Sequence, residues 1–435
     1  MMFFYELALT VLLANYVTAL PQYGRPAGQK PSTPKSDYYI SLGPRPYYLV
    51  NDMTPSPLKD RLESCENGPF SITDFSIGHR GGGTLQIPEE TVESTTAGAR
   101  MGAGVLECDV AFTRDRGLVC RHDLCDLHTT TNILLKPELA AKCSIPFTPA
   151  NGTRPANALC CTSDITMAEY MTLCGKMDGF NASARNPQDY QFGTPSWRTE
   201  LYSQCGTLMS LDSFITSVDS LPGHRSFTPE LKTPPSTVKM PFNGYTQEQY
   251  ASDMIEAFIR RGIDPNRVWA QSFNPPDIFL WINKYPQFGK HSVYLDQAGE
   301  TPANFTAAVA RLPSLAAQGV NIVAPPMQYL LTVGGPKNNT IVPSAYAIGA
   351  RAAGLDIITW TLERSGPLAR VAATRDSYYS TIASVIRRDG QLYEVLDVLA
   401  RQVGIKGIFS DWSATVTYYA NCFGLEGPVA ADYKP

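Results

Sequence analysis

The stretch VLECDVAFTRDRGLVCRHD, residues 105–123, decides the fold of this chain of 435 residues. Residues 105–110 and 118–122 each predict a β-strand. Only a short turn, about residues 113–117, separates the two strands, and a link of that length cannot carry a crossover helix. The strands must therefore pair antiparallel as a hairpin, in which residues 118–122 form an arm that folds back near the end of the first strand.

Strand-like and helix-like segments alternate over the rest of the chain. Eight barrel strands are expected, at residues 75–79, 105–110, a segment ending at 230–232, 268–273, 292–296, 320–324, 356–361 and 407–410. Helices are expected at residues 91–103, 246–261, 275–285, 305–318, 343–353 and 390–403. This alternation predicts an α/β fold of the TIM-type (β/α)8 barrel kind, and a doubly wound open sheet is the structural alternative.

The chain divides into four consecutive parts. We expect a signal peptide at 1–19, a Pro/Ser/Tyr-rich segment at 20–70 that packs against the body or stays loose, the barrel at 71–420, and a C-terminal tail at 421–435. Within the barrel, residues 124–226 are too many for an ordinary loop after a strand. We interpret them as an insertion closed by disulfides that shapes or covers the site.

Several features indicate export from the cell. The apolar run at residues 7–17 is shorter than the roughly 20 residues of a membrane-spanning helix, which favours a signal peptide over an anchor, with a short buried helix as the alternative. Ten cysteines predict disulfides formed in an oxidising compartment, although the sequence leaves their pairing open. The N-x-S/T acceptors for N-glycosylation are Asn151, Asn181, Asn304 and Asn338. We expect a secreted, extracellular protein without a transmembrane segment, either associated with the cell wall or free.

The composition excludes one class of partner. Hydrophobic residues make up 43% of the chain and charged residues 17%, which is enough for a large core. The net charge of −4 provides no basic surface for nucleic acid, whose binding requires many phosphate contacts from Lys and Arg. The sequence does not predict an oligomeric state.

The ends of three expected strands carry the residues that suit catalysis. Glu107 and Asp109 are two apart on a strand and therefore point to one face, where their repulsion favours a cation or a shared proton. With Glu230, which follows a later strand, they suit a hard divalent cation that prefers oxygen ligands. The alternative for the first two is a pair of solvent-facing acids on an edge strand. His79 ends the first strand and His122 ends the hairpin arm, where two imidazoles near a metal suit general acid–base catalysis.

Beside these groups, Arg80 and Lys232 have the charge to neutralise a phosphate. Asp123 is expected to hold His122 or Arg80 in place. Trp360 and Phe273, at strand ends, are equally consistent with core packing and with a pocket wall.

These residues lie in motifs through which the chain resembles the glycerophosphodiester phosphodiesterase family of phospholipase C-like phosphodiesterases. The motifs are Ile77-Gly78-His79-Arg80-Gly81, Pro88-Glu89-Glu90-Thr91, Glu107-Cys108-Asp109-Val110, His122-Asp123 and Pro229-Glu230-Leu231-Lys232, followed by Gln271-Ser272-Phe273, Trp360-Thr361 and Ser410-Asp411. The resemblance extends over about residues 75–413, with the motifs in the family's order.

The resemblance implies a TIM-type barrel that hydrolyses small-molecule glycerophosphodiesters to glycerol 3-phosphate and an alcohol. It implies that His79 and His122 are the acid and base, without deciding which is which. By the same resemblance, Glu107, Asp109 and Glu230 bind one divalent cation, calcium or magnesium. Arg80 and Lys232 hold the phosphate.

Two positions depart from the family's pattern. Glu90 stands where Asn is usual, and Ser410-Asp411-Trp412-Ser413 replaces the commoner Thr-Asp-x-Pro. We expect neither departure to touch the residues of the proposed site, so that both affect only the fine shape of the pocket.

Two other functions compete with this one. The first is another lipid phosphodiesterase on the same kind of barrel, a phosphatidylinositol phospholipase C or a sphingomyelinase D. The second is a non-catalytic barrel that binds a ligand, for which the metal ligands and histidines would be dispensable.

Overall fold

The computed structural model describes residues 39–199, 205–337 and 339–427. The expected signal peptide, Asn338 and the last eight residues of the expected tail lie outside these ranges. Within them, no helix is both long enough and apolar enough to cross a membrane.

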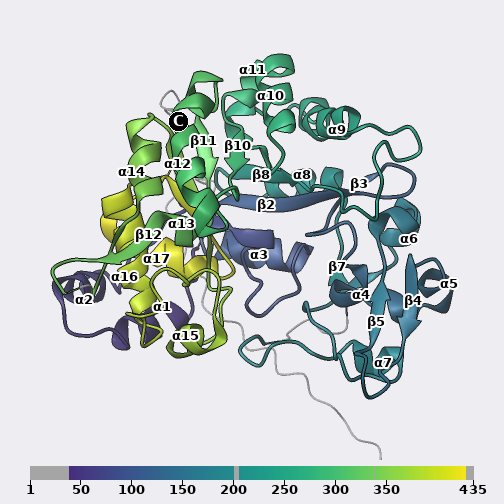
Figure 1. The fold of residues 1–435 in the computed structure, drawn as a ribbon, viewed down its shortest axis with the longest axis horizontal. Coiled ribbons are helices and arrows are strands. Elements are labelled where there is room, and N and C mark those ends of the chain that lie inside the picture. The colour runs from purple at the N-terminus through teal and green to yellow at the C-terminus, as the bar shows by residue number, and fades with distance from the viewer. Residues whose placement is uncertain (1–38, 200–204, 338, 428–435) are drawn as a thin grey trace, which may run out of the picture. The chain divides into compact units, whose positions relative to one another are not determined.

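Eight parallel strands close into a barrel (Figure 1). In order around the barrel they are β1 (Thr73–Gly78), β2 (Ala103–Phe112), β8 (Ser226–Leu231), β9 (Gln271–Ser272), β10 (Val293–Leu295), β11 (Ile322–Ala324), β14 (Asp356–Leu362) and β15 (Gly407–Ser410). The pairing of β15 with β1 closes the ring, so the sheet is not open. All eight expected strands are confirmed, with their ends shifted by a few residues.

The hairpin arm is also confirmed. β3 (Leu118–Cys120) pairs antiparallel with β2, with Val110 opposite Cys120. A disulfide between Cys108 and Cys120 joins the two strands covalently. The arm therefore begins at the end of β2 at which Glu107 and Asp109 lie.

The barrel strands are buried on both faces. Every residue of β2 and of β8 is buried, as expected for parallel strands covered by helices. Ile77, Val105, Ile322 and Ile358 fill the interior of the barrel, and a separate, larger core lies between the strands and the helices. The interior thus supplies a rigid base for groups at the strand ends.

The expected helices surround this barrel. They are α3 (Val92–Arg100), α9 (Gln247–Arg260), α10 (Pro275–Lys284), α12 (Pro302–Ala317), α14 (Ala345–Ala352) and α16 (Gln391–Asp397). The side chain of Thr91 caps α3, and Thr246 with Gln249 forms a capping box that begins α9. The chain continues from α16 as a π-helix over Val398–Val403. Among the helices of more than eight residues in the described chain, two were not expected: α8 (Leu211–Asp219), which packs against β2 and α9, and α17 (Ser413–Phe423).

The region that the sequence marked as an insertion folds into short elements that lie together on one side of the barrel (Figure 1). Disulfides Cys125–Cys161, Cys143–Cys160 and Cys174–Cys205 hold it. Its elements include α4 (Leu127–Thr130), α5 (Pro137–Ala140), β4 (Ile145–Thr148), β5 (Asn157–Leu159), α6 (Met167–Tyr170), β6 (Cys174–Gly175), α7 (Pro187–Tyr190) and β7 (Gly206–Thr207). Because each of these is short, the disulfides add covalent links to the buried apolar side chains of the region, which include Leu127, Ile133 and Tyr170.

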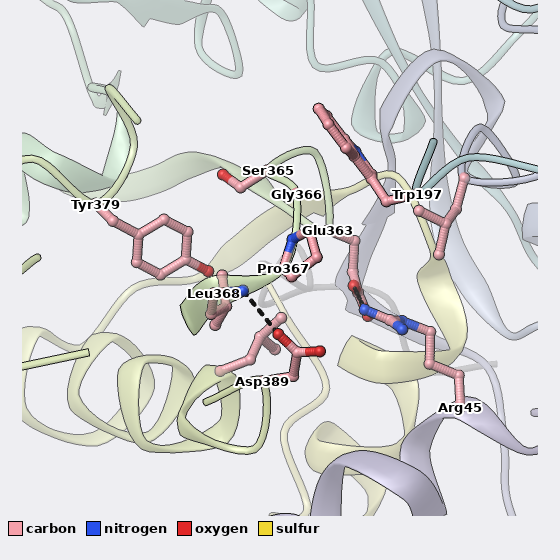
Figure 2. A pocket seen from close by; sticks show the side chains of 11 residues that line it. Arg45, Trp197, Glu363, Ser365, Gly366, Pro367, Leu368, Tyr379 and Asp389 are labelled. Atoms are coloured by element: carbon pink, nitrogen blue, oxygen red, sulfur yellow. Dashed lines mark hydrogen bonds and ion pairs between the residues drawn. The ribbon is translucent and has the colours of Figure 1, made fainter. Parts of the chain in front are cut away.

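The described part of the N-terminal segment packs against the barrel. It forms α1 (Arg45–Asn51) and α2 (Pro57–Glu63), whose residues Leu49, Val50 and Leu62 are buried. The disulfide Cys65–Cys422 ties it to α17. Figure 2 shows Arg45 of α1 beside Glu363, which follows β14, in a small pocket that Trp197 also lines.

The remaining α-helices and strands of the described chain lie between these elements. α11 (Pro286–Gly289) follows α10. α13 (Met327–Leu330) and the hairpin of β12 (Leu331–Gly334) with β13 (Thr340–Pro343) follow β11, and α15 (Val371–Thr374) follows β14.

Candidate active site

Three carboxylates meet at the C-terminal ends of β2 and β8. The strand register places Asp109 opposite Glu230, and Glu230 opposite Gln271 of β9. Glu107 lies two residues before Asp109 on the same face, whereas Cys108 belongs to the outer core. One oxygen from each of Glu107, Asp109 and Glu230 lies within 4.8 Å of the others, and all three residues are buried.

The carboxylates repel one another in this buried position. Burial, followed by the charges of Asp109 and Glu230, raises the pKa of Glu107 well above its usual value. Burial, with a further contribution from Asp109, raises the pKa of Glu230 to about 8. Burial also opposes ionisation of Asp109, but Lys232 and Arg80 hold the pKa of Asp109 below its usual value. A divalent cation would offset this repulsion.

The hydrogen bonding of the cluster leaves room for such a cation. Both side-chain oxygens of Asp109 are buried and accept no hydrogen bond. The nearby cations are at longer range, with Lys232 Nζ 3.5 Å from Oδ1 and Arg80 Nε 3.7 Å from Oδ2. Glu107 is fixed by the backbone amide of Arg80 at 2.7 Å and by the amide of Gln271 at 2.8 Å. Buried oxygens without donors suit a hard cation, so the three carboxylates fit the expected ligand set.

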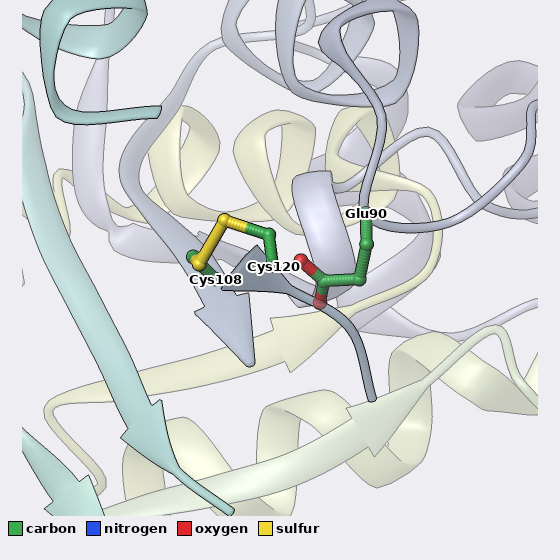
Figure 3. Close-up of side chains that lie close together, drawn as sticks. All are labelled: Glu90, Cys108 and Cys120. Carbon is green, nitrogen blue, oxygen red and sulfur yellow. A yellow bond between two sulfur atoms is a disulfide. The ribbon is translucent and has the colours of Figure 1, made fainter. Parts of the chain in front are cut away.

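Two other clusters of potential ligands fit a cation less well. Figure 3 shows Glu90 beside Cys108 and Cys120, but these sulfurs are joined in a disulfide and are not available as thiolates. In the second cluster Glu89 stands with His122 and Asp126. Both oxygens of Glu89 accept from Arg80 Nη1, at 2.9 and 3.0 Å, so this carboxylate is already neutralised.

His79 is oriented by Asp411, a motif residue for which the sequence predicts a part in the pocket floor and no contact with a histidine. Its Nδ1 lies 2.5 Å from Oδ1 of Asp411, which follows β15. Burial lowers the pKa of His79, and the charge of Asp411 partly offsets that effect. The bond fixes the imidazole and leaves Nε2 as the ring nitrogen available for chemistry.

Two arginines hold Asp411 in turn. Arg198 Nη2 lies 2.5 Å from Oδ2 of Asp411, and Arg364 Nη1 lies 3.1 Å from the same atom. Burial opposes the ionisation of Asp411, but Arg364 and Arg198 keep its pKa well below the usual value. Arg198 lies in the disulfide-held region, which therefore contributes directly to the support of His79. The sequence showed no pattern that links Arg198 to Asp411, because 213 residues separate them.

His122 lies on the other side of the site, directly after β3. Burial, then the charges of Arg80 and Lys232, lowers the pKa of His122 well below its usual value. Asp126, four residues on, lies close to it, and burial raises the pKa of Asp126 to about 8. The expected role of Asp123 is not seen, because its Oδ1 instead accepts from the amide of Cys125 at 2.7 Å.

Arg80 and Lys232 both line the cavity and are both paired with carboxylates. Arg80 has left-handed backbone angles, with φ 51°, which is uncommon for a residue with a side chain. Its side chain bonds Glu89, and Arg80 and Arg364 lower the pKa of Glu89 to about 2 although burial opposes this. Lys232 Nζ lies 2.6 Å from Oε1 of Glu230.

One departure from the family's pattern does touch the site, so the expectation was wrong for Glu90. Its Oε1 accepts from the amide of Asp109 at 3.3 Å. Asp411 is shared with the family's pattern, and Ser413, which stands in place of the usual Pro, bonds the carbonyl of Gly82. Burial and the charge of Asp109 raise the pKa of Glu90 well above its usual value, which favours the neutral acid. A neutral side chain is also what Asn would provide at this position.

All seven expected site residues except Asp109 line one cavity of about 250 Å³ at the mouth of the barrel. Asp109 lies directly behind it, in contact with Lys232 and Arg80. Phe273 and Trp360 form part of the opposite wall, so they are pocket residues and not only core. The wall is completed by Gln271, Leu295, Gln297, Tyr378 and Phe409.

Comparison with known proteins gives a consistent result. Residues 79–415 match the sequence profile of the Glycerophosphoryl diester phosphodiesterase family. A protein from Arthroderma benhamiae named "Extracellular protein" is 45% identical over 251 residues, which are 57% of this chain and all of that protein.

One solved structure supports the same fold. A crystal structure from Silicibacter pomeroyi, assigned as a glycerophosphoryl diester phosphodiesterase, superposes with a TM-score of 0.51 at 17% identity, over 84% of this chain and 98% of that one. A phosphodiesterase from Oleispira antarctica, solved with the product sn-glycerol-3-phosphate, gives a TM-score of 0.46 at 16% identity, over 79% of this chain and 96% of that one. Since the family profile covers most of the chain, the protein belongs to the glycerophosphoryl diester phosphodiesterase family.

Proposed function

We propose that this protein hydrolyses glycerophosphodiesters to glycerol 3-phosphate and an alcohol, with one divalent cation, calcium or magnesium, as its cofactor. One observation carries the proposal: the ends of β1, β2, β3 and β8 bring two histidines, two cationic side chains and two carboxylates to a single cavity, with the carboxylate of Asp109 directly behind it. The family membership gives the reaction class, and the carboxylate cluster supports the cation.

Arg80 and Lys232 are proposed to hold the phosphate. Both are buried cations at the cavity wall, where hydrogen bonds to the charged oxygens of a phosphodiester are stronger than in water. The ammonium group of Lys232 also forms an ion pair with Glu230. It is therefore proposed to interact with the carboxylates on one side and with the substrate phosphate on the other. A cation held by Glu107, Asp109 and Glu230 would polarise a phosphate oxygen as a Lewis acid.

His79 and His122 are proposed to transfer the protons. Burial keeps both imidazoles neutral near pH 7 in the protein alone, so either can accept a proton from the nucleophile, which is water or the neighbouring glycerol hydroxyl. The other must carry a proton to the leaving alcohol, and the negative phosphate favours its protonated form. The bond to Asp411 stabilises a protonated His79, which favours His79 as the acid.

The reaction is tested by incubating the purified protein with glycerophosphocholine and measuring glycerol 3-phosphate. We expect release with calcium or magnesium, loss of release with a chelator, and recovery when the metal is restored. Release of glycerol 3-phosphate that persists in the chelator would contradict the proposed cofactor. Failure to release it with any metal would favour another lipid phosphodiesterase, tested by release of inositol phosphate or ceramide phosphate, and after that a non-catalytic barrel.

The two histidines are tested by His79→Ala and His122→Ala. Each variant should lose at least about 100-fold in kcat, since a positioned acid or base contributes about 10²–10⁴-fold. His291→Ala is the control, because His291 bonds Asn266 away from the cavity and its loss should leave kcat unchanged. Full turnover in either site variant, with the fold intact by circular dichroism, would remove that histidine from the mechanism.

We also propose that the protein is secreted. Its ten cysteines all form disulfides, which persist in oxidising compartments, and a relative at 45% identity is named as extracellular. Asn151 and Asn304 are exposed and accessible to glycosylation. Retention at the cell wall is tested by comparing the protein in washed walls with that in the medium.

A further inference from the structure

The candidate catalytic cavity opens into a second, larger depression on the same face of the barrel. This depression, which we call the side groove, has a volume of about 980 Å³, against about 250 Å³ for the catalytic cavity. Gln297, Trp360 and Tyr378 line both spaces, so the two are continuous. The side groove therefore begins where the proposed phosphate site ends.

The walls of the side groove come from the segments after β10, β11 and β14. Phe305 of α12, Tyr329 of α13, Leu331 at the start of β12 and Ala345 of α14 form the part away from the catalytic cavity. Phe305 packs edge-on against Tyr329, with 5.9 Å between ring centroids. Trp360 and Tyr378 meet edge-on at 6.0 Å at the boundary between the groove and the cavity.

The chemistry of these walls disfavours an anionic occupant. Among the described residues that line the side groove, Glu300 alone is charged, and the other polar groups are hydroxyls and amides. No lysine or arginine is available there for a second phosphate. Aromatic and aliphatic side chains instead provide contact for a neutral apolar chain.

The size of the side groove also exceeds what the glycerol backbone and a small alcohol require. A pocket near 1,000 Å³ takes a ligand of drug size, whereas glycerophosphocholine has only a few carbon atoms on either side of its phosphorus. Apolar surface that stays exposed next to a catalytic cavity is characteristic of a binding groove. An occupant that fills the groove must therefore be attached to the phosphodiester.

We propose that the side groove binds the acyl chain of a monoacyl glycerophosphodiester, so that the preferred substrate is a lysophospholipid. This inference rests on the proposed function. In the reaction one water is consumed, the bond between phosphorus and the oxygen of the head-group alcohol breaks, and that oxygen gains a proton. The products are the free alcohol and monoacylglycerol phosphate, directly or through a cyclic phosphate formed by the neighbouring hydroxyl.

The first test compares substrates that differ only in the acyl chain. Choline release is measured from glycerophosphocholine and from 1-acyl-glycerophosphocholines with four, eight and twelve carbons, each below its micelle concentration. One fully buried methylene contributes about fourfold to binding, so partial burial predicts a rise in kcat/KM of at least about tenfold between the four-carbon and twelve-carbon substrates. A flat series with good turnover of glycerophosphocholine would overturn the groove while leaving the proposed function intact.

The second test fills the groove. Ala345 is an exposed groove residue at the start of α14, so Ala345→Trp adds bulk without disturbing the core. It should lower kcat/KM for the twelve-carbon substrate at least about tenfold and change that for glycerophosphocholine less than about twofold. Ile348→Trp is the matched control, because Ile348 lies on the same helix, is 62% exposed and does not line the groove. An equal loss for both substrates in Ala345→Trp, or no loss for either, would reject the proposal.

A binding measurement separates the two hypotheses if no diester is turned over. Calorimetric titration of the same lipids into the protein should give a Kd that falls with chain length and that Ala345→Trp raises at least about tenfold. Chain-dependent binding without turnover would keep the groove and refute the proposed reaction. Absence of both would refute both.

Discussion

The catalytic face of the barrel has two unlike halves. Around β1, β2, β3 and β8 it carries ionisable side chains, most of them in ion pairs or hydrogen bonds, such as Asp109 with Lys232 and Glu89 with Arg80. Around β10, β11 and β14 it carries aromatic rings and hydroxyls, such as Trp360 and Tyr378, beside an open groove. The side chains of the charged half are held in place by ion pairs and hydrogen bonds with one another. The open groove of the aromatic half, in contrast, has space for substrate groups of different size. This difference suggests that the first half sets the reaction and the second sets the substrate.

The largest effect should follow from a change in the charged half. Asp109→Asn keeps the shape of the side chain but removes the carboxylate that pairs with Lys232 and Arg80. We expect kcat to fall by about three orders of magnitude or more, because a metal ligand is lost and two buried cations lose a partner. Asp212→Asn, at an exposed position on α8, is the control. If Asp109→Asn binds metal and turns over normally, the charged half does not set the reaction.

The next effect concerns the support of His79. In Asp411→Asn the imidazole loses the charge that stabilises its protonated form, so its pKa should fall further. The limb of the pH–rate profile that belongs to His79 should therefore move to lower pH, and kcat at pH 7 should fall by about 100-fold. A profile of unchanged shape, with only a uniform loss, would indicate that Asp411 is structural.

A smaller effect is expected from the aromatic half. Tyr378→Leu removes a ring from the boundary between the cavity and the side groove. We expect KM for glycerophosphocholine to rise by about tenfold with kcat nearly unchanged, since the ring is proposed to bind substrate and not to react. Tyr378→Phe keeps the ring and should behave as wild type. A large loss of kcat in Tyr378→Leu would show that the aromatic half also affects the chemical step and would contradict the proposed difference between the halves.

The smallest effect lies at the opposite end of the barrel. Burial raises the pKa of Asp74, at the start of β1, to about 6 from 3.8. The folded state thus holds the proton more tightly than the unfolded state, and the resulting loss of stability grows as pH rises from about 4 to about 6. Asp74→Asn should be more stable than wild type by up to about 3 kcal/mol at pH 8 and no more stable at pH 4, measured by urea unfolding. A gain in the free energy of unfolding that is the same at pH 4 and pH 8 would mean that it does not come from the ionisation of Asp74.

Much of the charged half was predictable because its chemistry leaves a local signature. Glu107 and Asp109 lie two apart on one strand. His79 lies at the end of another strand, directly before Arg80, and Glu230 lies at the end of a third, two residues before Lys232. The eight strands and the arm followed from alternation and from the short turn before β3. These patterns lie within a few residues of one another in the sequence, where spacing determines geometry.

The rest depends on contacts between distant segments. The bond of Asp411 to His79 spans 332 residues, and that of Arg198 to Asp411 spans 213. The side groove arises where three separate segments meet, and apart from Trp360 its lining residues lie in none of the motifs. α17 was missed because its buried face is rich in small, aromatic and hydroxyl residues and does not show a simple apolar period. Disulfide pairing likewise depends on tertiary approach, which spacing does not give.

The disulfide between Cys65 and Cys422 encloses all eight barrel strands, because residues 65 and 422 lie on either side of β1 and β15. All the barrel strands therefore lie within one covalently closed loop of polypeptide, and both ends of the chain lie outside that loop. Exopeptidases that shorten either end cannot unthread a strand, and one cut in a surface loop leaves the two pieces joined. For a protein that is secreted, as we propose for this one, this disulfide means that two separate cuts are needed before any strand can be released.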